Sequence, residues 1–349
     1  MACTSDVTTA ISTSETTFGD GNATTISAVH PDIIQTHILS RLDGPALASV
    51  ATTCRQLYQL SSQEHLWAKI CHSTWPSTNS PHIRHVISTF PSRSRSFFPD
   101  SFPLLLTPAP STYNSHTNPD RTTELISAVD IFYRQQLIFS KVVETETVTG
   151  WFSCSPFRID LLDPKDVVQT PIKCPKGDEA CQDIGDDLSL SWIVIDPTGR
   201  RAVNLSSEKP VSVQRHWLSG EVHARFASVL TGDKGSSSEF AMCNLMITFG
   251  GVEGGDMHVR EASLQMEDMD GSHMNGRDSL VILQRALEGK RGRRVRPEQE
   301  GLKRYQEFLN MKKERKERKL RAEGRLDFLC AGLAVVSFAG LCCLFVFWR

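Results

Sequence analysis

HPDIIQTHILSRLDGPALASVATTCRQLYQLSSQEHLWAKIC, residues 30–71, is the stretch that decides how the N-terminal part of the chain folds. Pro31 suits the first turn of a helix, because the N–H that proline lacks would have no partner there. Asp43-Gly44-Pro45 has turn chemistry and ends that first helix. The spacing of the apolar residues predicts three short amphipathic helices. Their apolar positions are Ile34, Ile38 and Leu42; Leu47, Val50 or Ala51, and Cys54; and Leu66, Trp67 and Ile70.

Such a unit, of roughly forty residues, is too small to bury a good core alone. It also presents more apolar positions than one small core can use. We therefore expect it to complete its core on a partner or on the neighbouring domain.

The stretch resembles an F-box, in which Pro, Ile-Leu, Leu, Cys-Arg and Leu-Trp elements follow one another at similar spacing. The chain departs from the family pattern at His30, Thr53 and Leu57, where Leu, Val and Trp are common. A generic helical hairpin is the alternative, but order, spacing and turn residues all favour the F-box. The matching positions are Pro31, Ile34, Ile38-Leu39, Leu42, Leu47, Cys54-Arg55 and Leu66-Trp67.

F-box proteins are similar in being adaptors that carry a substrate to a cullin–RING ubiquitin ligase. The resemblance implies a substrate adaptor of an SCF-type ligase, with no catalysis or cofactor of its own. It implies contact between an apolar face of the F-box and a Skp-type linker subunit. The division of this face between interface and internal core stays open. The positions expected to contact the linker are Pro31, Ile34, Leu39, Leu42, Leu47, Val50 and Trp67.

Composition indicates a mainly globular chain of about two domains. The chain has 349 residues, of which 40% are hydrophobic and 22% charged, and its formal net charge is −2. Ten cysteines without a C-x-x-C pair argue against a zinc site and a disulfide framework, although Cys174 and Cys181 could pair. The predicted segments are a disordered tail (1–28), the F-box (29–75), a helix plus a Pro/Ser/Thr-rich linker (76–123), a β-sandwich-like substrate-recruiting domain (124–287), a basic helical segment (288–325) and a transmembrane tail anchor (326–349).

Short alternating strands separated by turn residues predict an antiparallel sandwich or jelly roll over residues 124–287, so the fold class is α+β. The glycine-rich loop 250–255 joins two of these strands, and 279–287 is either a strand or a short helix. Segments including WFSCSPFRIDLLDPKD and MHVREASLQMEDMDG are similar to a plant F-box subfamily, whose C-terminal half resembles phloem-lectin β-sandwiches. The predicted strands are 128–133, 136–139, 188–195, 211–217, 221–230, 240–249 and 257–266.

The C-terminal part combines a basic run with an apolar run. Residues 290–325 carry fifteen Lys and Arg against six Asp and Glu, and Pro297 can start a charged helix there. Leu302, Tyr305 and Leu309 give this helix a thin apolar stripe that could pack on the sandwich. Residues 328–348 hold no charge and, at about 1.5 Å per residue, are long enough to cross a bilayer. A buried core helix and a nuclear-import signal at 291–296 are the alternatives. The positive-inside rule predicts a tail anchor with the bulk of the chain in the cytosol, on a membrane that the sequence does not identify. The residues expected to fix this topology are Lys312, Lys313, Arg315, Lys316, Arg318, Lys319, Arg321 and Arg325.

No catalytic motif is present: the chain lacks a nucleophile elbow, a P-loop and a zinc-protease pattern. Nucleic acid is not expected as a partner. The glycosylation sequons at Asn22 and Asn204 would stay unmodified in a cytosolic chain. Besides the adaptor hypothesis, two others are open. One is a membrane-anchored β-sandwich binding module, with carbohydrate as a possible ligand and a vestigial F-box; the other is an enzyme in the β domain.

Overall fold

The computed structural model describes residues 29–103, 121–175, 177, 179–232, 240–289 and 297–348. The predicted disordered tail, the linker residues 104–120 and the basic cluster 290–296 lie outside these ranges. The chain divides between Leu66 and Trp67 into two compact units, and each is described by itself.

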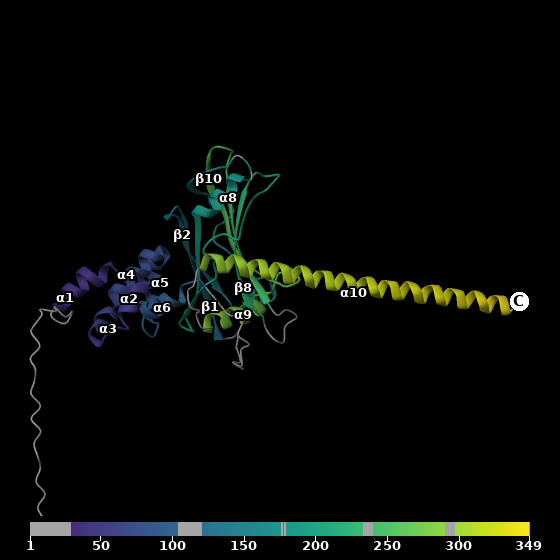
Figure 1. Ribbon diagram of the computed structural model, residues 1–349, viewed down its shortest axis with the longest axis horizontal. Helices are drawn as coiled ribbons and strands as arrows, with labels where there is room; N and C mark the ends of the chain where they lie inside the picture. Colours follow the sequence, from purple (N-terminus) through teal and green to yellow (C-terminus); the bar gives the residue numbers. More distant parts are fainter. Residues whose placement is uncertain are drawn as a thin grey trace, which may run out of the picture. The chain divides into compact units, whose positions relative to one another are not determined.

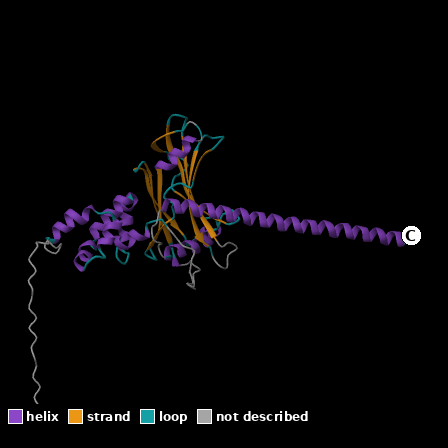
Figure 2. Cartoon of the chain, in the orientation of Figure 1, coloured by secondary structure: helices purple, strands orange, loops and turns teal. Residues whose placement is uncertain are grey.

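The regular secondary structure in the described part of the first unit is helical, with short loops between the helices (Figure 2). Asp43 caps α2 by accepting a hydrogen bond from the Ala46 amide at 2.8 Å, and the Cys54 thiol caps α3. The turn expected at residues 43–45 is therefore the start of α2. The first predicted helix is subdivided into α, π and 3-10 turns. In order the elements are α1 (Pro31–Ile33), η2 (Ile34–Ile38, a π turn), η3 (Leu39–Arg41, a 3-10 turn), α2 (Gly44–Val50), α3 (Arg55–Ser61) and the start of α4 (Glu64–Thr74).

The second unit begins within α4 and continues through η4 (Pro76–Asn79), α5 (Pro81–Ser88) and α6 (Ser94–Asp100). The helix predicted between residues 76 and 123 is present as α5. Rings from these helices form one aromatic cluster, in which Trp75 contacts Phe97, Phe98 and Phe102. Edge-to-face packing of this kind fixes the mutual orientation of short helices.

Two antiparallel sheets follow, as Figure 1 shows. Their facing residues form a single core, to which Ile131 and Trp192 contribute from one sheet and Phe226 and Ile247 from the other. The predicted sandwich is confirmed. The first sheet has the order β2 (Gln136–Glu146), β1 (Glu124–Tyr133), β5 (Leu188–Asp196), β6 (Arg201–Asn204). The second has the order β3 (Arg158–Asp160), β10 (Asp256–Asp268), β9 (Phe240–Gly250), β8 (Val222–Thr231), β7 (Ser212–Arg215), and β4 (Val168–Lys173) also pairs with β10.

Three further helices accompany the strands: α7 (Gly150–Cys154), α8 (Glu179–Asp187) and α9 (Gly276–Glu288). The ambiguous segment 279–287 is thus a helix, capped by Asn275, which accepts from the Asp278 amide. Neither α7 nor α8 was expected from the sequence. The predicted hairpin across residues 250–255 is confirmed by the pairing of β9 with β10.

A buried carboxylate joins η4 to the first sheet. Asp130 on β1 is fully buried. It accepts hydrogen bonds from the Ser77 amide at 2.9 Å, the Ser77 hydroxyl at 2.6 Å and the Ser140 hydroxyl at 2.7 Å. Burial raises the pKa of Asp130 above its ordinary value of 3.8, although these hydrogen bonds oppose the rise.

Asp130→Ala is expected to lower the free energy of unfolding by roughly 2–4 kcal/mol, because it leaves buried donors on Ser77 without an acceptor. Asp130→Asn should cost clearly less, since the amide oxygen still accepts and the Ser77 hydroxyl can rotate to accept from the amide nitrogen. Denaturant unfolding of the three proteins at neutral pH measures the difference. Equal losses in both variants would contradict this role for the hydrogen bonds.

Comparison of the parent with Asp130→Asn also gives a prediction on how stability depends on pH. Because the pKa of Asp130 is raised on folding, the folded chain holds this proton more tightly than the unfolded chain. Its stabilising contribution is complete below pH 3.8 and is lost as pH rises through the raised pKa. The parent should therefore lose stability relative to Asp130→Asn as pH rises from 3.8 through the raised pKa of Asp130. Parallel curves of stability against pH for the two proteins would refute this prediction.

Asn204 makes a second connection to the first sheet. Its side-chain nitrogen donates to the Ser101 carbonyl and to the Ser191 hydroxyl, each at 3.1 Å, and the residue is buried. The amide of this sequon is therefore inaccessible to a glycosyltransferase in the folded chain. These hydrogen bonds give Asn204 a structural role that explains an asparagine at this position.

The last helix, α10, runs from Pro297 to Phe347 without a break (Figure 1). Its first turns cover the outer face of the second sheet, where Tyr305 and Phe308 pack with Ala227, Met242 and Met269. The apolar stripe predicted at Leu302, Tyr305 and Leu309 is correct only at Tyr305, because Leu302 and Leu309 are exposed. The buried pair is spaced i, i+3, so the docked face is narrower than the prediction.

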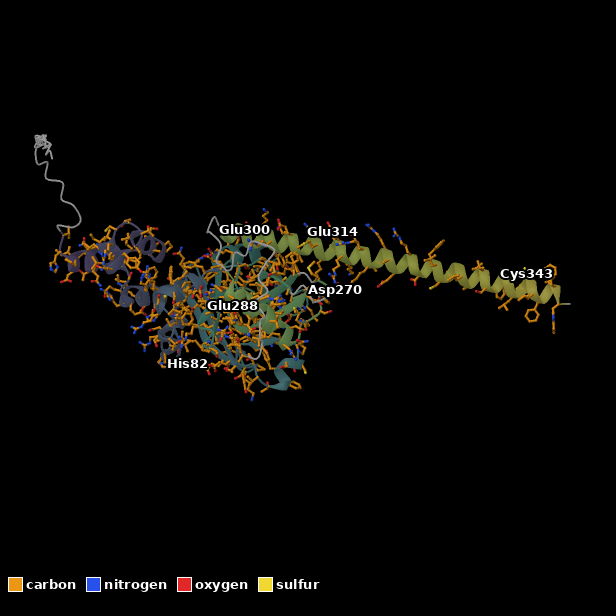
Figure 3. All side chains as sticks on the ribbon, turned by 90° about the horizontal axis from the view of Figure 1, so that it is seen from below. His82, Asp270, Glu288, Glu300, Glu314 and Cys343 are labelled. Carbon is orange, nitrogen blue, oxygen red and sulfur yellow. The ribbon has the colours of Figure 1, made fainter. Side chains whose placement is uncertain are left out.

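Ion pairs continue this docked face beyond Phe308. Arg315 makes a two-pronged contact with the Asp270 carboxylate, at 3.0 and 3.3 Å, and Lys319 contacts the same group at 2.8 Å. Figure 3 shows Asp270 beside α10. Hydrogen bonds from Lys319 and Arg315 lower the pKa of Asp270. Lys312 pairs with Glu267 at 3.7 Å, so three basic residues expected to fix membrane topology also attach the helix to the sandwich.

Candidate partner-binding site

The residues expected to contact a linker subunit fall into two groups by exposure. Pro31 is exposed, whereas Leu42 and Val50 are half-buried. The other four, Ile34, Leu39, Leu47 and Trp67, are buried. The Trp67 ring lies edge-on to Phe98 with centroids 5.4 Å apart, so it forms part of the aromatic cluster of the second unit.

Three other large apolar residues of the first unit are exposed instead. Ile33 is 50% exposed, Ile38 43% and Tyr58 48%. These three side chains are the large apolar groups that the described part of this unit offers to a partner. Ile33 and Tyr58 were not among the residues expected to contact the linker, and Ile38 was expected only as a member of an apolar stripe with Ile34 and Leu42.

The π turn explains why Leu39 is buried and Ile38 is exposed. In an α-helix Ile34 and Ile38 would share one face, but the buried residues are Ile34 and Leu39, which are five apart. A π turn holds more residues per turn than the 3.6 of an α-helix, so Leu39 replaces Ile38 on the inner side. The adjacent apolar pairs at 33–34 and 38–39 were the available signal, because each pair puts one residue inside and one outside.

Polar contacts within and just after the π turn hold this part of the chain. The Gln35 side chain lies 3.2 Å from the His65 ring, which ties η2 to the start of α4. Thr36 and Ser40 donate to backbone carbonyls one turn earlier. Ile33 and Ile38 are therefore presented from a backbone whose conformation is fixed by other residues.

The sandwich carries a separate group of exposed apolar side chains on two hairpin loops. Trp217 and Leu218 lie in the β7–β8 loop and Val252 in the β9–β10 loop, and all three are largely exposed. Arg215 and Glu253 join the loops by an ion pair at 3.5 Å. Ser219 and His216 hold the first loop by hydrogen bonds at 3.0 and 3.1 Å. The loops present their apolar side chains on a fixed frame.

An open cavity of about 400 Å³ lies along the edge strand β2. Lys141 and Asp166, which form an ion pair at 3.6 Å, line it with apolar neighbours. The apolar members of the lining are Ile138, Phe139, Leu162, Val167 and Val168.

No cluster of three or more His, Cys, Asp or Glu residues that could hold a metal ion occurs in the part of the chain that the structure describes.

Helix α10 is long enough, and its C-terminal half apolar enough, to cross a membrane. Its large side chains, from Phe328 to Trp348, are exposed on every side of the helix. Figure 3 shows Cys343 near the end of this helix, far along α10 from Glu300. A soluble core helix would have a buried face, which this half of the helix lacks.

Comparison with known proteins identifies the helical part. A family model described as F-box-like matches residues 31–73. This range contains the predicted motif, both residues that the π turn exposes, and all of α4 except its last residue. No solved structure matches the chain.

Curated relatives match almost the whole chain. The probable F-box protein At2g36090 of Arabidopsis thaliana is 48% identical over 93% of this chain and 94% of its own length. The F-box protein At2g27310 of the same plant is 45% identical, over 88% of this chain and 93% of its own. A third, F-box protein At3g44326 of Arabidopsis thaliana, is 43% identical over 94% and 92%. Likeness at this level extends well beyond the helical motif, and the chain therefore belongs to the plant F-box protein family.

Proposed function

We propose that this chain is a substrate adaptor of an SCF-type ubiquitin ligase and does no chemistry of its own. The observation that carries the proposal is the F-box-like match over residues 31–73, in a unit that exposes large apolar side chains. The partner is a Skp-type linker subunit, and through it a cullin–RING ligase.

The proposed linker contact combines the accessible members of the expected set with the residues that the structure exposes. Pro31, Leu42 and Val50 belong to the first group, and Ile33, Ile38 and Tyr58 to the second. In this proposal Ile34, Leu39 and Leu47 act as core residues of the unit that carries the surface. Removing such a buried aliphatic side chain would destabilise the unit. Interface energy is concentrated in a few such anchors.

In the same proposal the sandwich recruits the substrate. The hairpin loops that carry Trp217, Leu218 and Val252 offer the apolar contact area on which a protein partner can pack. Tryptophan is also enriched among the residues that dominate binding energy at interfaces. The substrate is a protein, since ubiquitin ligases modify lysine side chains.

We also propose that α10 anchors the adaptor to a membrane, with the bulk of the chain on the cytosolic side. The uncharged run 328–348 and the basic run before it support this orientation. Such an anchor would restrict ubiquitination to substrates at one membrane.

Co-purification tests the adaptor function. The full chain, in detergent, should recover the linker and the cullin in one complex. The complex should ubiquitinate the chain itself when the conjugating enzymes and ATP are added, since adaptors are close to the transferred ubiquitin. A folded chain that recovers neither subunit would refute the adaptor function and leave the sandwich as a binding module.

A further inference from the structure

The basic segment of α10 contains two stripes of charge with the same spacing. Lys312, Arg315 and Lys319 lie at i, i+3 and i+7, and they form the stripe that pairs with Glu267 and Asp270 of the sandwich. Arg318, Arg321 and Arg325 repeat this spacing. At 3.6 residues per turn the two stripes lie roughly 120° apart around the helix axis. The sandwich therefore uses one stripe and leaves the other, here called the arginine stripe, turned away from it.

The arginine stripe is exposed and poorly neutralised. All three residues are exposed. Among the described residues Arg321 pairs with Glu317 at 3.2 Å, whereas Arg318 and Arg325 form no ion pair. Like charges three and four residues apart on a helix repel each other. A negatively charged surface against this stripe would relieve the repulsion.

The stripe ends beside the apolar run. Counting from Phe328 at about 1.5 Å per residue, Arg325 lies about 4.5 Å, Arg321 about 10 Å and Arg318 about 15 Å before it. The headgroup region on each side of a bilayer is roughly 5–8 Å thick, and screening at physiological salt extends over about 8 Å more. All three guanidinium groups are therefore within the electrostatic reach of lipid headgroups when residues 328–348 span the bilayer.

We infer that the arginine stripe binds the phosphate groups of anionic lipid headgroups in the leaflet that α10 enters. Guanidinium groups suit this ligand, because their planar fork donates two parallel hydrogen bonds to a phosphate. The ligand is a lipid surface and not the sandwich, whose carboxylates already occupy the other stripe. This inference rests on the proposed membrane anchor.

Lipid selectivity in reconstituted membranes tests the inference. The full chain is placed in vesicles of phosphatidylcholine, and spin-labelled phosphatidylserine or phosphatidylcholine reports association with the protein. One basic residue near an anionic surface is worth roughly fivefold in partitioning, so the parent should prefer phosphatidylserine by at least about fivefold. R318Q/R321Q/R325Q should bring this preference close to one.

The matched control is K312Q/R315Q/K319Q, which removes the same charge from the sandwich-facing stripe and should keep the lipid preference. Equal loss in both triple variants would overturn the inference, because net charge alone would then explain the selectivity. No preference in the parent would also overturn it. Resistance to carbonate extraction, measured on the same vesicles, reports membrane insertion separately, so failure of the anchor is distinguished from failure of lipid selectivity.

Discussion

Ile33→Ala combined with Ile38→Ala is expected to weaken binding of the Skp-type linker by two to three orders of magnitude. An anchor residue at the centre of an interface is worth about 2 kcal/mol or more, or roughly thirtyfold in affinity. Both side chains are about half exposed, so truncation should leave the fold and its unfolding midpoint nearly unchanged. Titration calorimetry with purified linker measures the affinity, and circular dichroism monitors the fold.

Two further variants separate interface from core. Gln59→Ala, on the exposed surface of α3, should leave affinity and stability as they are. Leu39→Ala with Leu47→Ala removes two buried side chains and should cost about 2–5 kcal/mol of stability for each residue. If that pair reduced linker affinity without loss of stability while the isoleucine pair bound normally, the buried residues would be the true contacts.

The second large effect concerns the apolar half of α10. Val336→Lys with Phe338→Lys places two charges near the middle of the uncharged run, where each lysine costs roughly 2.5–3.5 kcal/mol on insertion scales. The double variant should therefore move from the carbonate-resistant membrane fraction to the extractable fraction almost completely. Fractionation of cells that express each protein, followed by immunoblotting, measures the distribution.

Leu320→Lys is the matched control for this experiment. Leu320 is also an exposed apolar residue of α10, but it lies within the basic segment and outside residues 328–348. This variant should remain in the membrane fraction. A parent chain that is itself extractable would refute the anchor, and so would a double-lysine variant that resists extraction.

Patterns that repeat along the chain made the fold predictable. Alternation of apolar and polar residues identified strands such as β8 and β10, because each has one face on the core and one face turned outward. The hydrophobic run 188–195 identified β5, which is buried on both faces. Strands β3 and β6, of three and four residues, are too short to show a period and were missed.

The candidate site was less predictable than the fold. The F-box motif placed the right segment, yet it could not separate the outer from the inner member of each isoleucine or leucine pair. That choice depends on the π turn, and a single residue of helical phase decides which side chain is buried. Asp130 likewise gave no local signal, because its partner Ser77 is distant in the sequence.

The basic segment shows the same limit. Its eight Lys and Arg residues from 312 to 325 look equivalent as composition, and all were expected to act on membrane topology. Only the positions of Glu267 and Asp270 reveal that Lys312, Arg315 and Lys319 face the sandwich. Tertiary contacts divide a run of charge that sequence alone treats as uniform.

The continuity of α10 also restricts how this family can vary in length. Eight residues lie between Lys319, which pairs with Asp270 of the sandwich, and Phe328, the first residue of the apolar run. Inserting one residue there would turn the sandwich by about 100° about the helix axis and raise it by about 1.5 Å. Insertions of seven or eleven residues return nearly the original orientation. Tolerance of length changes in this interval should therefore follow the helical repeat, with insertions of seven or eleven residues tolerated better than an insertion of one.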